Sequence, residues 1–350
     1  EGLINNVFDP LFARYYMPLI EKFFKIFPEG MVKSIIFSKN INPLEGFSVL
    51  TTGLYVPFVV VFPYVFAFYL VLSILEDTGY LARFAVILDR FSHKLGLHGY
   101  ASLPVIMGFG CKVSGILHLR ILESEREKII AASLLLLITP CIPQSAMIMA
   151  ALYKYSFYYP VIVFLYMFFV GILASFLLNR IMKGTSNELF IEIPPYHVPQ
   201  LKSILVKMKV RLGEFIKDAV PVIAGGVFLI NILDIFSVLS YISKLLGPIF
   251  EKFLLLPKET SALFALGFLK KDVSITLLTA FSLTPGEIMV GSFFLATYMP
   301  CLASILMLFK ELGKKSAFYV IVFNLIISFV FTSIFAFILK YWDAFHLVGP

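Results

Sequence analysis

The chain has 350 residues, of which 59% are hydrophobic and 15% are charged, and its mean hydropathy is +0.91. A soluble domain carries roughly 25% charged residues, so this composition excludes a water-soluble globular protein and predicts a multi-pass protein surrounded by the lipid bilayer. The net charge of +7 does not indicate a nucleic-acid partner, because Lys and Arg collect in the cytoplasmic loops of membrane proteins.

The first segment of the chain combines apolar and charged residues. Residues 11–27 are apolar apart from two lysines, an arginine and a glutamate, a pattern more typical of a helix at the membrane interface than of a span. We therefore expect an interfacial amphipathic segment over residues 1–45. The chain begins with Glu1 and shows no signal-peptide pattern, which we interpret as a fragment or a processed product.

The first predicted span covers residues 49–75, which carry no charge and exceed the ~20 residues that a helix needs to cross a bilayer. The span is followed by Glu76 and Asp77. This acid pair has two interpretations: it gathers cations on a transport pathway, or it ends the helix in water.

Three later apolar segments are interrupted directly before a cysteine. Residues 100–119 are broken before Cys111, and the span predicted at 129–153 is broken before Cys141. A third break precedes Cys301. The glycine and proline residues at these helix breaks are Gly108, Gly110, Pro140 and Pro300.

The second half of the chain repeats the pattern of the first. Gly-Phe-Leu-Lys-Lys at Gly267 resembles Gly-Phe-Gly-Cys-Lys at Gly108, and Met-Pro-Cys at Cys301 resembles Thr-Pro-Cys at Cys141. The spacings agree, because 141 − 108 = 33 and 301 − 267 = 34. The other predicted elements are a charged loop at 120–128, spans near 155–178, 219–241, 286–309 and 316–341, an amphipathic piece near 242–256 and an interrupted segment at 260–283.

The distribution of basic residues predicts the topology. The polar region 179–218 and the lysines near 310–315 are the strongest cytoplasmic candidates, and both face the cytoplasm only if 260–283 is re-entrant. The same reasoning makes 100–119 re-entrant from the cytoplasmic side, so that the two hairpins enter the membrane from opposite faces. The chain is thus expected to contain a first gate repeat at 46–180, a cytoplasmic basic linker at 181–217 and a second, inverted gate repeat at 218–345.

This organisation indicates a function class. Backbone that is broken at membrane depth is tolerated only where it lines a cavity or is buried in protein. Inverted repeats built from broken helices are a recurring transporter design, with the binding site near the bilayer midplane. We therefore predict an all-α, gate-type transporter fold with two inverted repeats of broken, re-entrant helices.

The cysteines are candidate ligands for a transported ion. Thiolates are soft ligands that suit iron, copper(I) or zinc, although a cysteine can also pack as a small apolar residue. All three cysteines, Cys111, Cys141 and Cys301, follow helix breaks, which favours an ion path, and no structural disulfide is expected. The residues predicted to support this path are Ser114, Gln144, Ser145, Glu76, Asp77 and Asp272.

Lys112, next to Cys111, has two interpretations. A cation at this position lowers the pKa of the neighbouring thiol but repels an entering metal ion. Alternatively, the side chain extends to water at the mouth of the hairpin.

No known catalytic or metal motif is found. His118 is expected to be interfacial, and the other histidines show no metal-ligand spacing. The metalloprotease pattern HExxH, the nucleophile elbow GxSxG and the phosphate loop GxxxxGK[ST] are all absent from the sequence. We therefore expect a chain that is not an enzyme and holds no cofactor.

Several motifs together resemble the membrane domain of ferrous iron transport protein B (FeoB). They are Leu-Glu-Asp-Thr-Gly-Tyr-Leu-Ala-Arg at 75–83, Met-Gly-Phe-Gly-Cys at 107–111, Arg-Ile-Leu-Glu-Ser-Glu-Arg at 120–126, Gly-Phe-Leu-Lys-Lys-Asp-Val at 267–273 and Tyr-Met-Pro-Cys at 298–301. They occur in order along about residues 45–340.

The resemblance implies Fe(II) uptake across a bacterial or archaeal plasma membrane, with Cys111, Cys141 and Cys301 on the iron path. In the family, this region follows a cytoplasmic GTP-binding domain and an additional first helix, so GTP would bind to a missing or separate domain. A small accessory protein and a homo-oligomer are further expected partners.

This sequence departs from the family pattern at the first two cysteines. The family commonly has Asn-Val-Pro after the first cysteine, whereas this chain has Lys112-Val-Ser, and the segment around Cys141 is also divergent. Two alternatives therefore stay open: a gate-fold carrier of another divalent metal or a nucleoside, and a membrane scaffold that does not transport.

Overall fold

The computed structural model describes residues 62–182, 196, 198–214, 216–217, 221, 247–248, 250–257, 260, 267, 274–275, 278, 281, 283–298 and 301–346. No strand occurs among these residues, and the expected all-α class is confirmed for this part of the chain. The predicted interfacial segment 1–45, most of the span at 219–241, Asp272 and Pro300 lie outside it. Residues 1–78 and 197–238 make up one compact unit, and residues 79–196 and 239–350 make up the other.

The first unit contains helices α5 (Phe62–Asp77) and α12 (Leu201–Glu214), which pack against each other. Helix α12 therefore forms within the polar region that was predicted as a linker. Arg211 pairs with Glu76, and Lys207 Nζ lies 3.5 Å from Glu76 Oε1 and 3.2 Å from Asp77 Oδ1. These ion pairs give the two acidic residues a structural role in joining the helices.

Asp77 is expected to make this helix pair sensitive to acid. Hydrogen bonds from the Ser203 hydroxyl and the Gln200 backbone N–H, together with Lys207, hold the pKa of Asp77 at about 2, below its ordinary value of 3.8. The stabilisation is thus complete above pH 3.8 and is lost as the pH falls through 2. In detergent, the difference in Tm between the wild type and Asp77→Asn should be smaller at pH 3 than at pH 6. A difference that does not change with pH would contradict this assignment.

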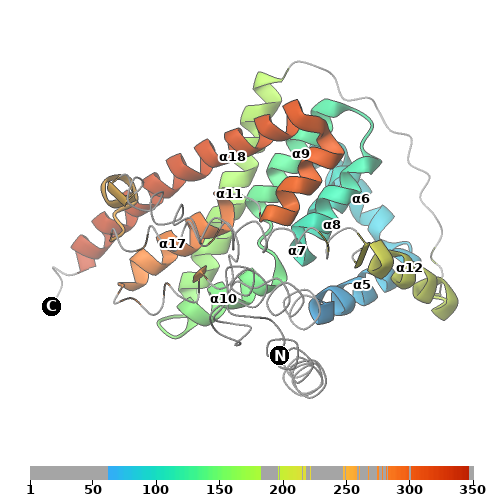
Figure 1. Ribbon diagram of the computed structural model, residues 1–350, viewed down its shortest axis with the longest axis horizontal. Helices are drawn as coiled ribbons and strands as arrows, with labels where there is room; N and C mark the ends of the chain where they lie inside the picture. Colours follow the sequence, from blue (N-terminus) through green and yellow to red (C-terminus); the bar gives the residue numbers. More distant parts are fainter. Residues whose placement is uncertain are drawn as a thin grey trace, which may run out of the picture. The chain divides into compact units, whose positions relative to one another are not determined.

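The second unit begins with a helical hairpin that is broken at a cysteine (Figure 1). Its elements are α6 (Tyr80–Lys94), the 3-10 helix η3 (Gly99–Ala101), α7 (Ser102–Gly110), α8 (Lys112–Leu117) and the 3-10 helix η4 (His118–Ile121). Cys111, between α7 and α8, has extended backbone angles (φ −151°, ψ 126°). A Cβ on Gly115 would lie 2.7 Å from the Pro104 carbonyl oxygen, so only glycine permits this close packing of α8 on α7.

The following helices are interrupted by proline, as predicted. Helices α9 (Glu125–Ile138) and α10 (Ile142–Tyr153) are separated by three non-helical residues, and α11 (Tyr158–Ile181) comes next. Thr139 is non-helical (φ −100°, ψ 99°) because the residue before a proline avoids the α region. Helix α9 begins earlier than predicted, since the Ser124 hydroxyl accepts a hydrogen bond from the Glu127 N–H and so caps the helix within the expected loop.

The second half contributes a π-helical turn, η6 (Phe250–Leu254), and helices α17 (Pro285–Thr297) and α18 (Leu302–His346). Helix α17 starts with a capping box formed by Thr284 and Glu287. Gly313 interrupts α18 with a left-handed conformation (φ 75°), between the spans predicted at 286–309 and 316–341. In the described part of the chain, three helical stretches are long and apolar enough to span a membrane: Glu125–Tyr153, Tyr158–Ile181 and Ala303–Tyr341.

An aromatic core joins the two halves of this unit. The ring of Tyr166 on α11 stacks on Phe335 of α18 at 4.4 Å between centroids and meets the edge of Phe293 on α17 at 4.8 Å. The Tyr166 hydroxyl donates a hydrogen bond to the Phe331 carbonyl at 2.8 Å. A buried aromatic cluster of this kind favours one relative placement of the three helices, which in turn positions the helix breaks.

Candidate functional site at the helix breaks

The three cysteines lie at helix breaks, although they are distant in sequence. Cys111 separates α7 from α8, Cys141 directly precedes α10, and Cys301 directly precedes α18. All three thiols are free and partly exposed. The structure therefore places the predicted ligands at three helix breaks of one unit. Among the described residues, these three cysteines do not form a group whose ligand atoms all lie within 4.8 Å of one another.

Each proline-linked cysteine contacts a polar side chain one helical turn further on. The Cys141 thiol lies 3.9 Å from Gln144 Oε1, and the Cys301 thiol lies 3.1 Å from the Ser304 hydroxyl. The offset is the same in both halves, because 144 − 141 = 3 and 304 − 301 = 3. Ser304 was not predicted, and aligning the two repeats around their cysteines would have found it. The buried Gln144 also donates from Nε2 to the Leu295 carbonyl at 3.2 Å.

Lys112 is buried, which contradicts the interpretation that its side chain extends to water. Only 5% of the residue is exposed, and its Nζ donates hydrogen bonds of 3.0 Å to the carbonyls of Leu136 and Ala296. These carbonyls lie four residues before Pro140 and Pro300 (140 − 4 = 136 and 300 − 4 = 296). Proline has no N–H to donate to the carbonyl four residues earlier. One Lys112 side chain therefore donates to both of the carbonyls that lie four residues before a proline in the sequence.

The position of Lys112 also has an electrostatic reason. The Leu136 and Ala296 carbonyls belong to the last turns of α9 and α17, and the C-terminal end of a helix carries partial negative charge. The Lys112 Nζ thus lies between two helix ends that lead to Cys141 and Cys301. Lys112 therefore places a buried, hydrogen-bonded amine beside the helix breaks.

The glycines at the breaks permit close helix packing. A Cβ on Gly108 would lie 3.0 Å from Leu135, and a Cβ on Gly267 would lie 2.6 Å from Leu295. Each of these leucines precedes its cysteine by six residues (141 − 135 = 6 and 301 − 295 = 6). The two halves of the chain therefore repeat a tertiary contact as well as a sequence pattern.

The other predicted residues have more local contacts. Ser114 is buried in α8, and Gly110 ends α7. The Ser145 hydroxyl donates to the Cys141 carbonyl at 3.1 Å, so this side chain satisfies a backbone group at the break. Glu76 and Asp77 belong to the other unit, where they pair with α12.

Comparison with known proteins supports these repeats. The Gate family, described as nucleoside recognition, matches residues 58–154 and 216–315. The family described as ferrous iron transport protein B C terminus matches residues 161–211.

This chain belongs to the Gate family, in its FeoB-type form. The expected resemblance is thereby confirmed, and the Gate region occurs twice, as the sequence repeat predicted.

Curated relatives of this Gate protein extend well beyond it. The Fe(2+) transporter FeoB of Methanocaldococcus jannaschii is 29% identical over 91% of this chain and 52% of its own length. The Fe(2+) transport protein A/Fe(2+) transporter FeoB fusion protein of Porphyromonas gingivalis is 32% identical over 54% of this chain and 22% of its own length. A Staphylococcus aureus Fe(2+) transporter FeoB is 28% identical over 78% of this chain and 46% of its own length. The chain therefore spans about half or less of these relatives. No solved structure matches it significantly.

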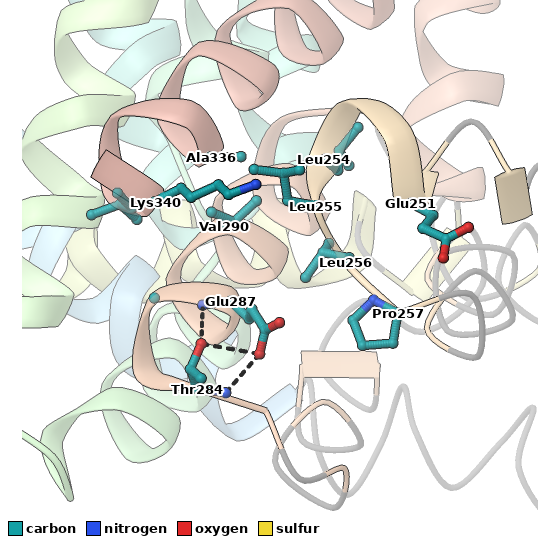
Figure 2. A pocket seen from close by; sticks show the side chains of 12 residues that line it. Glu251, Leu254, Leu255, Leu256, Pro257, Thr284, Glu287, Val290, Ala336 and Lys340 are labelled. Carbon is teal, nitrogen blue, oxygen red and sulfur yellow. Dashed lines mark hydrogen bonds between the residues drawn. The ribbon is translucent and has the colours of Figure 1, made fainter. Parts of the chain in front are cut away.

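A pocket of about 580 Å³ lies elsewhere in the second unit of this Gate protein (Figure 2). No cysteine occurs among the described residues that line it. Glu287 points into it, but its Oε2 accepts hydrogen bonds from the Thr284 N–H (2.7 Å) and hydroxyl (3.0 Å). Because this carboxylate is used in capping α17, the pocket does not present a built ion site.

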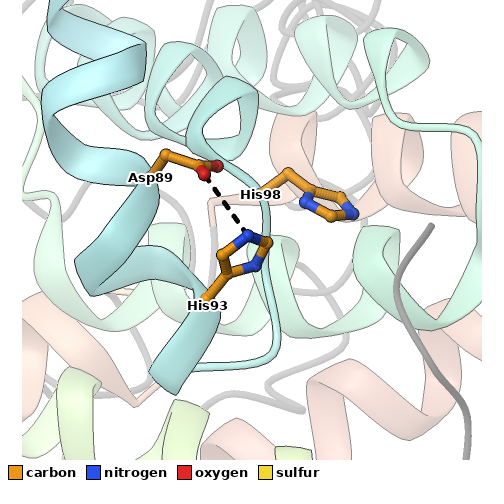
Figure 3. A group of neighbouring side chains, drawn as sticks. All are labelled: Asp89, His93 and His98. Atoms are coloured by element: carbon orange, nitrogen blue, oxygen red, sulfur yellow. Dashed lines mark ion pairs between the residues drawn. The ribbon is translucent and has the colours of Figure 1, made fainter. Parts of the chain in front are cut away.

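One prediction about the histidines was wrong. Asp89, His93 and His98 place potential metal-ligand atoms within 4.8 Å of one another (Figure 3). Asp89 and His93 are four residues apart on α6, a spacing that puts both side chains on one face of a helix. That spacing was a signal available in the sequence, whereas the approach of His98 depends on the turn that follows.

Proposed function

We propose that this chain provides the Fe(II) path of a FeoB-type transporter and carries the ion inward across a bacterial or archaeal plasma membrane. The observation that supports the proposal most directly is the position of Cys111, Cys141 and Cys301 at helix breaks in both Gate regions. Thiolates prefer Fe(II) to hard ions such as Mg²⁺. The relatives' printed descriptions as Fe(2+) transporters support the same substrate.

In this proposal, the cysteines act as transient ligands along the path. Gln144 and Ser304, which contact the thiols of Cys141 and Cys301, supply oxygen donors, and Ser114 lines the same region. Conduction requires binding that is weak enough for the ion to leave, which a partly hydrated ion between flexible thiols satisfies. We place the two Gate regions in inverted orientations, so that their broken helices meet near the bilayer midplane.

The alternative substrate, a nucleoside or another polar solute, is favoured by the positive charge of Lys112. The structure supports it less well, because Lys112 Nζ already donates to the carbonyls of Leu136 and Ala296. Its burial is explained by these bonds without an anionic substrate. GTP hydrolysis, an accessory protein and homo-oligomer formation belong, in this proposal, to partner chains or to further domains.

The test is protection of the cysteines from a thiol reagent. The reconstituted chain is treated anaerobically with N-ethylmaleimide, and the modification of each cysteine is measured by mass spectrometry. We expect Fe(II) to slow the modification of Cys111, Cys141 and Cys301, and Mg²⁺ at the same concentration to have no effect. Protection by a nucleoside but not by Fe(II) would support the alternative carrier. If neither Fe(II) nor a nucleoside protects the thiols, the result would support the alternative of a membrane scaffold that does not transport.

A further inference from the structure

Three side chains outside the cysteine site point toward a common centre (Figure 3). Asp89 and His93 come from the last two turns of α6, and His98 comes from the loop that follows. Their potential ligand atoms all lie within 4.8 Å of one another. The cluster thus combines one carboxylate with two imidazoles, a donor set that neither the cysteine path nor the resemblance to FeoB requires.

The end of α6 explains why His98 returns to the helix. The Leu97 N–H donates to the Ser92 carbonyl and the Gly96 N–H donates to the His93 carbonyl, both at 3.0 Å. This pair of bonds is a Schellman motif, and it needs the left-handed conformation that Gly96 supplies (φ 76°). The chain reverses there and carries His98 back beside His93, with ring centroids 5.0 Å apart.

The environment of His98 favours one tautomer of its imidazole ring, and this determines which ring nitrogen is left to bind a metal ion. Only 3% of the residue is exposed, and its buried Nε2 makes no hydrogen bond, yet Oε1 of Glu127 lies 3.3 Å away. Metal-binding histidines commonly direct their second ring nitrogen toward a carboxylate, which fixes the tautomer. With the proton on Nε2 facing Glu127, the lone pair of Nδ1 is free for a metal ion.

Asp89 is also held in a suitable orientation. Its Oδ1 accepts a hydrogen bond from the Gly99 N–H at 2.7 Å, which leaves Oδ2 directed toward His93 Nε2 at 3.3 Å. Ligand atoms that bind one ion at about 2.0–2.2 Å lie about 3.3 Å apart in tetrahedral geometry. Asp89 and His93 therefore already have the spacing of two ligands, and the exposed His93 side chain can adjust to complete the site.

We propose that Asp89, His93 and His98 bind a divalent first-row transition-metal ion, with Glu127 as a positioning residue. Two imidazoles and one carboxylate suit Fe(II) and Zn(II) and leave coordination positions open to water. The basic residues of the neighbouring sequence, including Arg90, predict a cytoplasmic location. This site is separate from the cysteines and does not depend on the chain transporting Fe(II).

The test is equilibrium binding of Zn(II) to the full chain in detergent, measured by competition with a chromophoric chelator. We expect His93→Gln, a change at an exposed side chain, to weaken one Zn(II) site by at least about 100-fold, because outer positioning residues alone change metal affinity by 10–100-fold. Glu127→Gln should weaken the same site by about 10–100-fold and shift the visible absorption of bound Co(II). The matched control, His118→Gln, should bind like the wild type.

The result separates this site from the cysteine path. The same Zn(II) equivalent should remain in the variant with Cys111→Ser, Cys141→Ser and Cys301→Ser, and it should disappear when His93→Gln is added. Unchanged Zn(II) stoichiometry and affinity in His93→Gln, or an equal loss in His118→Gln, would overturn the proposal. Because no flux is measured, a failure of Fe(II) transport would leave this result unaffected.

Discussion

Replacing any one of the three cysteines with serine should reduce Fe(II) flux into proteoliposomes by about 100-fold, since even residues that only support a metal ligand contribute 10–100-fold to metal affinity. Cys111, Cys141 and Cys301 lie at helix breaks in one unit. Serine preserves the shape of the side chain but replaces a soft sulfur donor with a protonated hydroxyl. The measurement is anaerobic uptake of Fe(II), with equal amounts of each reconstituted variant.

Ser333→Ala provides a matched control for these variants. Ser333 is partly buried, and its hydroxyl donates within α18 to the Phe329 carbonyl, far along the helix from Cys301. This variant should transport like the wild type and unfold at a similar temperature. Flux that is unchanged in all three serine variants would rule out cysteine ligands while leaving transport by the Gate fold intact.

Replacing Lys112 with methionine is expected to increase Fe(II) flux by at least tenfold. Methionine has a similar length but no charge, and it removes the 3.0 Å hydrogen bonds from Nζ to the Leu136 and Ala296 carbonyls. A divalent ion about 6 Å from a unit positive charge is destabilised by about 5 kcal/mol at an effective dielectric constant of about 20. Removing the ammonium should therefore lower the main electrostatic barrier at the cysteines.

Lys112→Arg tests whether charge is the cause. The guanidinium keeps the positive charge, so this variant should show no gain in flux. The same proteoliposome assay measures both variants, with thermal unfolding in detergent as a check on folding. A loss of flux in a folded Lys112→Met protein would contradict the hypothesis that Lys112 is an electrostatic barrier to Fe(II). It would show instead that the ammonium assists transport by holding the two Gate regions together.

Local chemistry determined much of the fold. Pro140 ends α9 because a proline restricts the backbone of the residue before it. The glycines around Cys111 permit α7 and α8 to pack closely as a hairpin. The long charge-free runs predicted the membrane spans because lipid tolerates few charges. The repeated spacing from glycine to the Pro-Cys pair likewise predicted, from the sequence alone, that the Gate region occurs twice.

The partners of side chains were decided by tertiary structure. Lys112 and Ala296 are 184 residues apart, and whether that lysine reaches water or two carbonyls depends on how α9 and α17 pack around α8. His98 meets His93 only because a Schellman turn reverses the chain, and Glu127 approaches from another helix. Sequence patterns record the periodicity and breaks of single elements, whereas the direction of a side chain between elements follows from packing. The sequence by itself therefore determined the helix breaks, the cysteines that follow them and the family. The tertiary structure decided that Lys112 donates hydrogen bonds to carbonyls near both proline breaks. It also decided that Asp89, His93 and His98 lie close enough to form a second candidate metal site.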